Sequence, residues 1–223
     1  MISFDLFRLF MYNVGDMDTN RFYAKLKKMQ FTLCNGFTKK GKVVFVGDSL
    51  TQGCDLKKFY PTVDSVNRGI GGDTLQWLFL RTDCSIFNLK PKAIVFLMGI
   101  NDLNFYGASV EDMMDRYTAF FSLLQKKCKD TPVIVQSLYP VITEGKTKYP
   151  MVKGIKKSVS LLNEYLERLC ENYGYIFVNV YEKLECNGQL DEKYSKDCLH
   201  LNDEGYEVVA DLINEKLGEV LID

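Results

Sequence analysis

Histidine is almost absent from this chain, which has 223 residues and a single histidine, His200. Any imidazole chemistry must therefore come from His200, and no zinc site can draw on several imidazoles. The seven cysteines do not suggest a metal site either, because their number is odd, their spacings are scattered and no C-x-x-C pair occurs. We therefore predict no metal, and reduced thiols in a reducing cytoplasm.

The chain also lacks net charge and long apolar runs. Its 28 basic and 29 acidic side chains give a net charge of -1, without the basic excess of a nucleic-acid-binding surface. No uncharged run approaches the ~20 residues needed to cross a bilayer, so no membrane span is predicted. The apolar residues 1–10 include Asp5 and Arg8 and lack a basic leader and a cleavage site, which argues against a signal peptide. A small-molecule ligand is expected, and the oligomeric state stays open.

Short apolar runs predict strands, and amphipathic patterns between them predict helices. Five strands are expected, at 42–46, 63–67, 93–98, 132–136 and 175–180. The third run is apolar at every position, as in a strand covered on both faces. Apolar residues three and four apart predict helices at about 21–32, 110–124, 155–173 and 202–217. Asn202 is placed to cap the last of these helices.

Strands that alternate with helices indicate βαβ units and an α/β domain. We expect a three-layer α/β/α sandwich with a central parallel five-stranded sheet, spanning residues 42–223. Residues 1–41 precede this domain and are expected to form a helical extension packed on it. The longest predicted loop, residues 139–151, is either a lid or a surface connection.

Polar, glycine-rich loops follow three of the predicted strands. They read Gly47-Asp48-Ser49-Leu50, Asn67-Arg68-Gly69-Ile70-Gly71-Gly72-Asp73 and Met98-Gly99-Ile100-Asn101-Asp102. Right-handed crossovers bring such loops to the carboxyl edge of a parallel sheet, where ligands bind. We expect these loops to converge there with Asp197 and His200 from the loop after the fifth strand.

Together these residues provide the groups that acyl transfer needs. Ser49 supplies a nucleophilic hydroxyl, His200 a general base, and Asp197 a carboxylate three residues away that can orient the ring. The backbone N–H groups of Ser49 and Gly72 and the side-chain amide of Asn101 are candidate oxyanion donors. This chemistry needs no cofactor.

Four blocks of the chain resemble the SGNH-hydrolase superfamily, the GDSL-type esterases and lipases. In family order they are Gly47-Asp48-Ser49-Leu50, Gly69-Ile70-Gly71-Gly72-Asp73, Gly99-Ile100-Asn101-Asp102 and Asp197-Cys198-Leu199-His200. The second block is similar in particular to the branch that includes the platelet-activating-factor acetylhydrolase catalytic subunits. The resemblance implies a flavodoxin-like fold and metal-independent ester hydrolysis. It also implies roles for five residues: nucleophile for Ser49, oxyanion donors for Gly72 and Asn101, base for His200, and orienting acid for Asp197.

We therefore predict a serine hydrolase that cleaves acetyl or short-chain acyl esters through an acyl-enzyme intermediate. Acylated sugars, lysophospholipids and thioesters all remain open as substrates. The alternative is a non-catalytic carbohydrate- or lipid-binding module on the same fold, since a fold does not determine a function. No block of the family covers residues 1–41.

Some neighbouring residues allow other interpretations. Asp203 and Glu204 could replace Asp197 beside the histidine, although a place in the first turn of a helix explains them. Cys198 lies two residues before His200, and a small packed side chain is the preferred interpretation there.

The aspartates of the glycine-rich loops, Asp48, Asp73 and Asp102, are expected to bond local backbone N–H groups and shape the turns. Three aromatic residues could line an acyl or sugar pocket but are not assigned as substrate contacts: Trp77, Phe105 and Tyr106.

Overall fold

The computed structural model describes residues 17–143 and 149–221. Within them, five parallel strands form one sheet in the order β2-β1-β3-β4-β5. The strands are β1 (Val43–Gly47), β2 (Ser65–Gly69), β3 (Ala93–Leu97), β4 (Val133–Gln136) and β5 (Ile176–Val178). The predicted five-stranded parallel sheet is confirmed.

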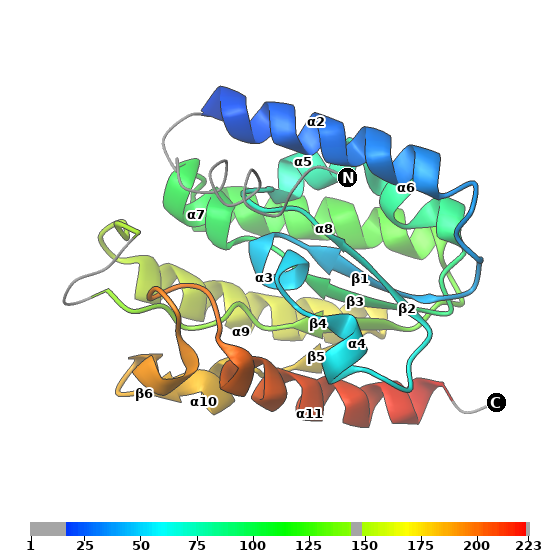
Figure 1. Cartoon of the computed structure of the whole chain (residues 1–223). Coiled ribbons are helices and arrows are strands. Elements are labelled where there is room, and N and C mark those ends of the chain that lie inside the picture. The colour runs from blue at the N-terminus through cyan, green and yellow to red at the C-terminus, as the bar shows by residue number, and fades with distance from the viewer. Residues whose placement is uncertain (1–16, 144–148, 222–223) are drawn as a thin grey trace.

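Helices cover both faces of this sheet. The long ones are α2 (Met17–Cys34), α8 (Val110–Lys127), α9 (Ile155–Tyr173) and α11 (Asp203–Val220). The short ones are α3 (Ser49–Gln52), α4 (Leu56–Phe59), α5 (Leu75–Phe79), α6 (Thr82–Ser85), α7 (Ile100–Phe105) and α10 (Tyr181–Leu184). Figure 1 shows α2 and α8 on one side of the sheet and α11 on the other, which confirms the three-layer α/β/α sandwich.

The apolar runs became strands because they are buried on both faces. Every residue of β1 and of β3 is buried, and the two strands pair in register from Val43 opposite Ala93. Aromatic side chains of α8 fill the space above β3, where Phe96 stacks on Phe120 with ring centroids 5.0 Å apart. Such burial of large apolar side chains provides most of the free energy that favours this fold.

Polar residues set the starts of two long helices. Ser109 and Asp112 form a reciprocal capping box at the start of α8. Asn202 caps α11 as predicted, because its side-chain oxygen accepts a hydrogen bond from the backbone N–H of Gly205 at 3.0 Å. The second cap also holds the chain that leads from His200 into the helix.

The short helices α3 to α7 and α10 were not predicted, and the observed strands differ from the predicted ones in three main respects. β2 lies two residues later than predicted, because it stays paired with β1 until Gly69 lies opposite Gly47. β5 is shorter than the predicted run at 175–180. A two-stranded hairpin of β6 (Glu185–Cys186) and β7 (Gln189–Leu190) was not predicted, although its turn is an Asn-Gly pair, which favours such hairpins.

The helix expected near residues 21–32 is α2, and it packs on the sandwich. Phe31 is buried in a small cluster with Ile70 and Cys84. The guanidinium of Arg68 lies 4.5 Å from the Phe31 ring centroid. The first sixteen residues of the predicted extension lie outside the described residues.

Part of the predicted 139–151 loop is packed against the protein. Tyr139, Val141, Ile142 and Tyr149 are buried, and residues 144–148 lie outside the described residues. A lid function for this loop therefore stays a prediction.

Candidate active site

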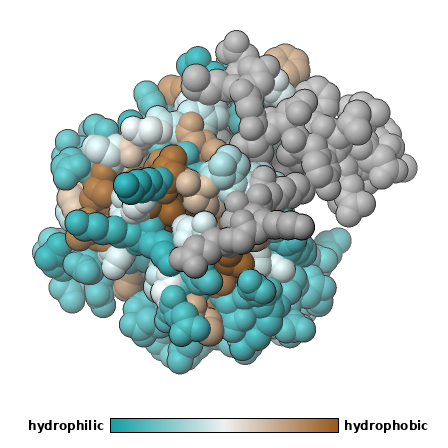
Figure 2. Space-filling model, turned by 90° about the vertical axis from the view of Figure 1, so that its left-hand side faces the viewer, coloured by the Kyte–Doolittle hydropathy of each residue, from teal (hydrophilic) through white to brown (hydrophobic). Residues whose placement is uncertain are grey.

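The loops at the carboxyl ends of the strands lie at one edge of the sheet. There α3 begins after β1, and α7 begins after β3. Both lie at the left of Figure 1, together with the chain that enters α11. Figure 2 views the molecule from that side and shows apolar residues exposed between polar ones.

Three of the predicted site residues form a chain of hydrogen bonds. The Nε2 atom of His200 lies 2.9 Å from the Oγ atom of Ser49, although 151 positions separate the two residues. The Nδ1 atom of the same ring lies 2.9 Å from Oδ2 and 3.1 Å from Oδ1 of Asp197. The ring nitrogens thus face a hydroxyl on one side and a carboxylate on the other, as nucleophilic catalysis requires.

The end of β1 sets the position of Ser49. At Gly47 an added Cβ would overlap Thr51 and the backbone oxygen of Leu97, so the tight passage from strand to helix requires glycine. Asp48 caps α3 and accepts a hydrogen bond from the backbone N–H of Leu50 at 2.9 Å, in agreement with its predicted turn-forming role. Complete burial raises the pKa of Asp48 to about 7, and the bond from Leu50 opposes the rise.

A turn closed by Asp197 itself positions His200. The Oδ1 atom of Asp197 accepts the backbone N–H of His200 at 2.8 Å, in addition to facing the ring. Partial burial raises the pKa of Asp197, but the hydrogen bonds from His200 and Leu199 outweigh it, and the pKa lies below its ordinary value. Among its competitors, Asp203 pairs instead with Lys58 at 2.9 Å.

The proposed oxyanion donors face the same cavity as Ser49 and His200. Gly72 and Asn101 both line it. Gly72 has a φ of 71°, a conformation that side-chain-bearing residues rarely adopt. The Nδ2 atom of Asn101 donates one N–H to the backbone oxygen of Asp73 at 2.9 Å. Because a primary amide has two N–H donors, the other can serve a substrate oxygen.

Comparison with known proteins shows the family to which the chain belongs. Residues 45–208 match the GDSL-like lipase/acylhydrolase family. The chain belongs to this family. A GDSL esterase/lipase of Arabidopsis thaliana is 30% identical over 210 residues, a match covering 80% of this chain and 86% of that protein. Family membership and this relative identify the chain as a carboxylic ester hydrolase.

Solved structures of other proteins share the fold of this GDSL-like hydrolase. A Streptococcus pneumonia protein, provisionally described as a platelet activating factor, superposes with a TM-score of 0.81 at 22% identity, covering 87% of this chain and 92% of that one. A GDSL-like lipase of Bacteroides thetaiotaomicron gives 0.77 at 24% identity, covering 87% and 98%. At such identities the likeness concerns the fold alone.

Two other aspartates of this GDSL-like hydrolase bind partners distant in the sequence. The carboxylate of Asp73 pairs with Arg81 at 2.6 Å, and both side chains are almost completely buried. Asp102 accepts the backbone N–H of Leu75 at 3.0 Å and pairs with Arg116 at 2.9 Å. Burial raises the pKa of Asp102 to about 6, and these bonds oppose the rise. Asp73 also accepts the local backbone N–H of Thr74, as predicted, but the pairing of both carboxylates with arginines of other segments was not predicted.

Arg81 is a supporting residue that the sequence analysis missed. Its guanidinium also donates hydrogen bonds to the backbone oxygens of Arg68 and Gly47, at 2.9 and 3.1 Å. It thereby connects the ends of β1 and β2 with the loop that carries Gly72. Nothing in the sequence distinguishes Arg81 from a surface arginine.

The cavity beside Ser49 has further lining residues that the sequence did not assign. Tyr149 meets the His200 ring edge-on, with centroids 5.4 Å apart. Phe105 and Tyr106 line the cavity, whereas Trp77 lies in a neighbouring hollow. Asn20 reaches the cavity from α2 and donates to the Tyr106 hydroxyl at 3.3 Å. Of these residues, only Phe105 and Tyr106 lie just after a motif, Gly99-Ile100-Asn101-Asp102, so only they could have been predicted from the sequence to lie near the site.

Two further findings concern the described residues alone. Within residues 17–143 and 149–221, no group of three or more acidic, cysteine or histidine side chains is placed to hold a metal ion. No helix in that part of the chain is long and apolar enough to cross a membrane.

Proposed function

We propose that this GDSL-like hydrolase cleaves short-chain carboxylic esters through an acyl-enzyme formed on Ser49. The observation that supports the proposal most directly is the chain of 2.9 Å contacts from Asp197 through His200 to Ser49. Hydrogen-bonding reach between nucleophile, base and orienting acid is the geometry that this mechanism needs.

In the first step the Oγ atom of Ser49 attacks the acyl carbon. The Nε2 atom of His200 accepts the hydroxyl proton and then delivers it to the leaving alcohol. Asp197 holds the ring in the correct tautomer and stabilises its positive charge. The backbone N–H groups of Ser49 and Gly72 and the amide of Asn101 donate to the developing oxyanion.

In the second step water replaces the alcohol. His200 removes a proton from the water, whose oxygen attacks the acyl carbon of the ester on Ser49. The same donors stabilise the second tetrahedral intermediate. When this intermediate collapses, His200 returns the proton to the Oγ atom of Ser49, and the carboxylic acid leaves.

The narrow cavity beside Ser49 supports a small acyl group. Its volume is about 50 Å³, and its apolar lining includes Phe105 and Leu199. A long acyl chain needs a longer apolar channel to remove its carbon atoms from water. Acetyl esters are therefore the preferred substrates in this proposal.

The cysteines support a cytoplasmic location as part of the proposal. All seven lie in described segments and carry thiols rather than disulfides. Cysteines commonly stay reduced in the cytoplasm.

Replacement of Ser49 by alanine tests the nucleophile. We expect Ser49→Ala to abolish p-nitrophenyl acetate turnover and labelling by a fluorophosphonate, with the circular dichroism spectrum unchanged. Ser122→Ala is the matched control, since Ser122 lies exposed on α8 and bonds Tyr173. Wild-type turnover by Ser49→Ala would refute the assignment. Failure of the folded wild-type protein to take up the label would favour a binding module.

A further inference from the structure

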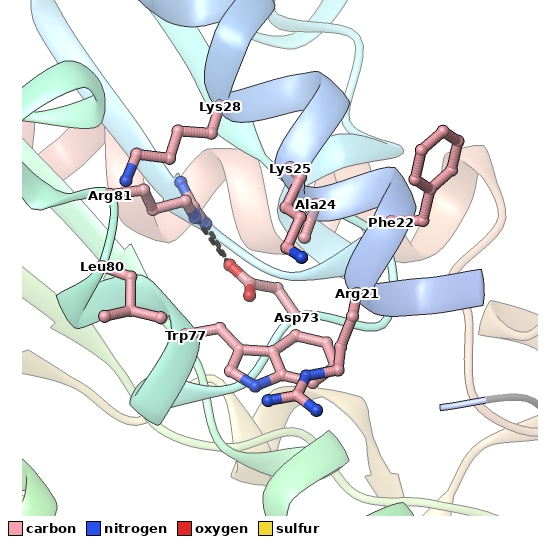
Figure 3. Close-up of a pocket in the computed structure, with 9 residues that line it drawn as sticks. All are labelled: Arg21, Phe22, Ala24, Lys25, Lys28, Asp73, Trp77, Leu80 and Arg81. Atoms are coloured by element: carbon pink, nitrogen blue, oxygen red, sulfur yellow. Dashed lines mark hydrogen bonds and ion pairs between the residues drawn. The ribbon is translucent and has the colours of Figure 1, made fainter. Parts of the chain in front are cut away.

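A second hollow, which we call the α2 groove, lies beside the active-site cavity, between α2 and α5. Its volume is about 660 Å³, much larger than the active-site cavity. Arg21, Lys25 and Lys28 line it from α2, while Trp77 and Leu80 line it from the α5 segment. Figure 3 shows Lys25 pointing toward the centre of the groove and Arg21 beside the indole of Trp77.

The α2 groove concentrates positive charge in a chain whose net charge is -1. Its lining has four cationic side chains and one carboxylate, that of Asp73. Asp73 is fully buried and already paired with Arg81. Among residues 19–143 and 149–221, whose side chains are described, no carboxylate lies within ion-pair distance of Arg21, Lys25 or Lys28. Three cations thus surround the groove without an anionic partner among the described residues.

A single layer of side chains separates the α2 groove from the active site. Asn20, which lines the active-site cavity, precedes Arg21 on α2. Asn20 bonds the hydroxyl of Tyr106, and the Tyr106 ring meets Trp77 edge-on with centroids 5.1 Å apart. The two hollows are therefore neighbours that share the wall formed by Asn20, Tyr106 and Trp77.

We propose that the α2 groove binds a phosphate group carried by the ester substrate, an inference that rests on the proposed function. Arginine can bind phosphate through two parallel N–H donors, and lysine supplies a compact charge. Trp77 and Leu80 offer apolar surface to the carbon atoms next to the phosphate. Since α2 precedes the family-matched residues 45–208, this selectivity belongs to the N-terminal segment of the chain.

Two esters that differ only by a phosphate test the proposal. We expect kcat/KM for 1-acetyl-glycerol 3-phosphate to exceed that for 1-acetyl-glycerol, and added salt to reduce the difference. In the double variant Lys25→Gln/Lys28→Gln the ratio of the two kcat/KM values falls about tenfold, since two exposed charge contacts are lost. The matched control Lys126→Gln/Lys127→Gln removes the same charge from the end of α8 and keeps the wild-type ratio.

The outcomes separate this proposal from the proposed function. Wild-type protein that cleaves neither ester contradicts the proposed function. Equal kcat/KM for the two esters, or an unchanged ratio in Lys25→Gln/Lys28→Gln, overturns the phosphate site alone.

A binding measurement is independent of activity, because Trp77 is the only tryptophan of the chain. Its fluorescence is expected to change with glycerol 3-phosphate but not with sodium chloride of equal ionic strength. A response to glycerol 3-phosphate indicates a soluble phosphate ester. A response only to vesicles containing phosphatidic acid, and not to pure phosphatidylcholine vesicles, indicates a lipid headgroup. No response to either overturns the proposal.

Discussion

Replacing Arg81 by methionine tests how the buried ion pair supports the active site. Methionine has nearly the same length but no charge and no N–H donor. The variant leaves the carboxylate of Asp73 buried without its cation and removes donors from the backbone oxygens of Gly47 and Arg68. Because the Arg81 side chain is only 2% exposed, water cannot easily replace the lost bonds.

The expected loss of stability follows from this burial. Removing one partner of a buried ion pair costs about 3–5 kcal/mol, because the other charge stays uncompensated. For a chain of this size, each kcal/mol lowers Tm by about 2–4 °C. We therefore expect Arg81→Met to lower Tm by roughly 6–20 °C. We also expect kcat/KM to fall by about 10²-fold, as when a loop near the reacting atoms moves by an ångström.

Thermal unfolding followed by circular dichroism, with p-nitrophenyl acetate turnover at 20 °C, measures both effects. Arg168→Met is the matched control, since Arg168 lies exposed on α9, and its Tm should stay within about 2 °C of wild type. The double variant Asp73→Asn/Arg81→Met should recover part of the loss, because it removes the uncompensated charge. If Arg81→Met unfolds within 2 °C of wild type, the buried pair does not stabilise the loop that carries Gly72.

Three further predictions concern the site. Asp197→Asn should lower kcat by about 10⁴-fold, because the imidazolium loses its carboxylate and the ring its correct tautomer. Steady-state kinetics showing a loss below tenfold would contradict this. Gly72→Ala should lower kcat/KM about tenfold, because a backbone φ of 71° costs an L-residue roughly 1–2 kcal/mol and the new Cβ approaches Asn20. The double variant Asn20→Ala/Gly72→Ala removes the contact with Asn20 and should still be impaired. Full recovery of kcat/KM in that double variant would exclude backbone strain as the cause. Burial raises the pKa of Asp48 from 3.8 to about 7, so the stability of the wild-type protein should decline as the pH rises from 3.8 to about 7. Between pH 5 and 8 the Tm of Asp48→Asn should fall less than the Tm of the wild type. An equal fall in Tm would refute the raised pKa of Asp48.

Much of the fold could be predicted from local patterns. The uninterrupted apolar run of β3 indicated a strand covered on both faces, and Asn202 indicated the start of α11. The end of β2 was harder to predict, because Asn67 and Arg68 are polar. There the pairing with β1, rather than the residue types, extends the strand to Gly69.

The sequence also limited the possible chemistry. With one histidine in the chain, His200 was the only candidate imidazole base. The glycine-rich loops suggested Ser49, Gly72 and Asn101, because parallel strands end at a common edge. These inferences needed only residue types, their order and the known handedness of crossovers.

Residues with no local signal could be placed only by the structure. Asn20 and Tyr149 reach the active-site cavity from segments without a motif. Arg81 is buried because Asp73 neutralises it, and such a pairing depends on how distant segments pack.

The sequence by itself determined the approximate positions of the five sheet strands and of the long helices, and which single residue can act as an imidazole base. Tertiary structure alone decided that Ser49 and His200 meet, that Arg81 lies beneath the loop carrying Gly72, and that the cations of α2 surround a groove. The physical reason is that apolar periodicity records which side of an element is buried. Contacts between distant side chains arise only when those buried sides pack together.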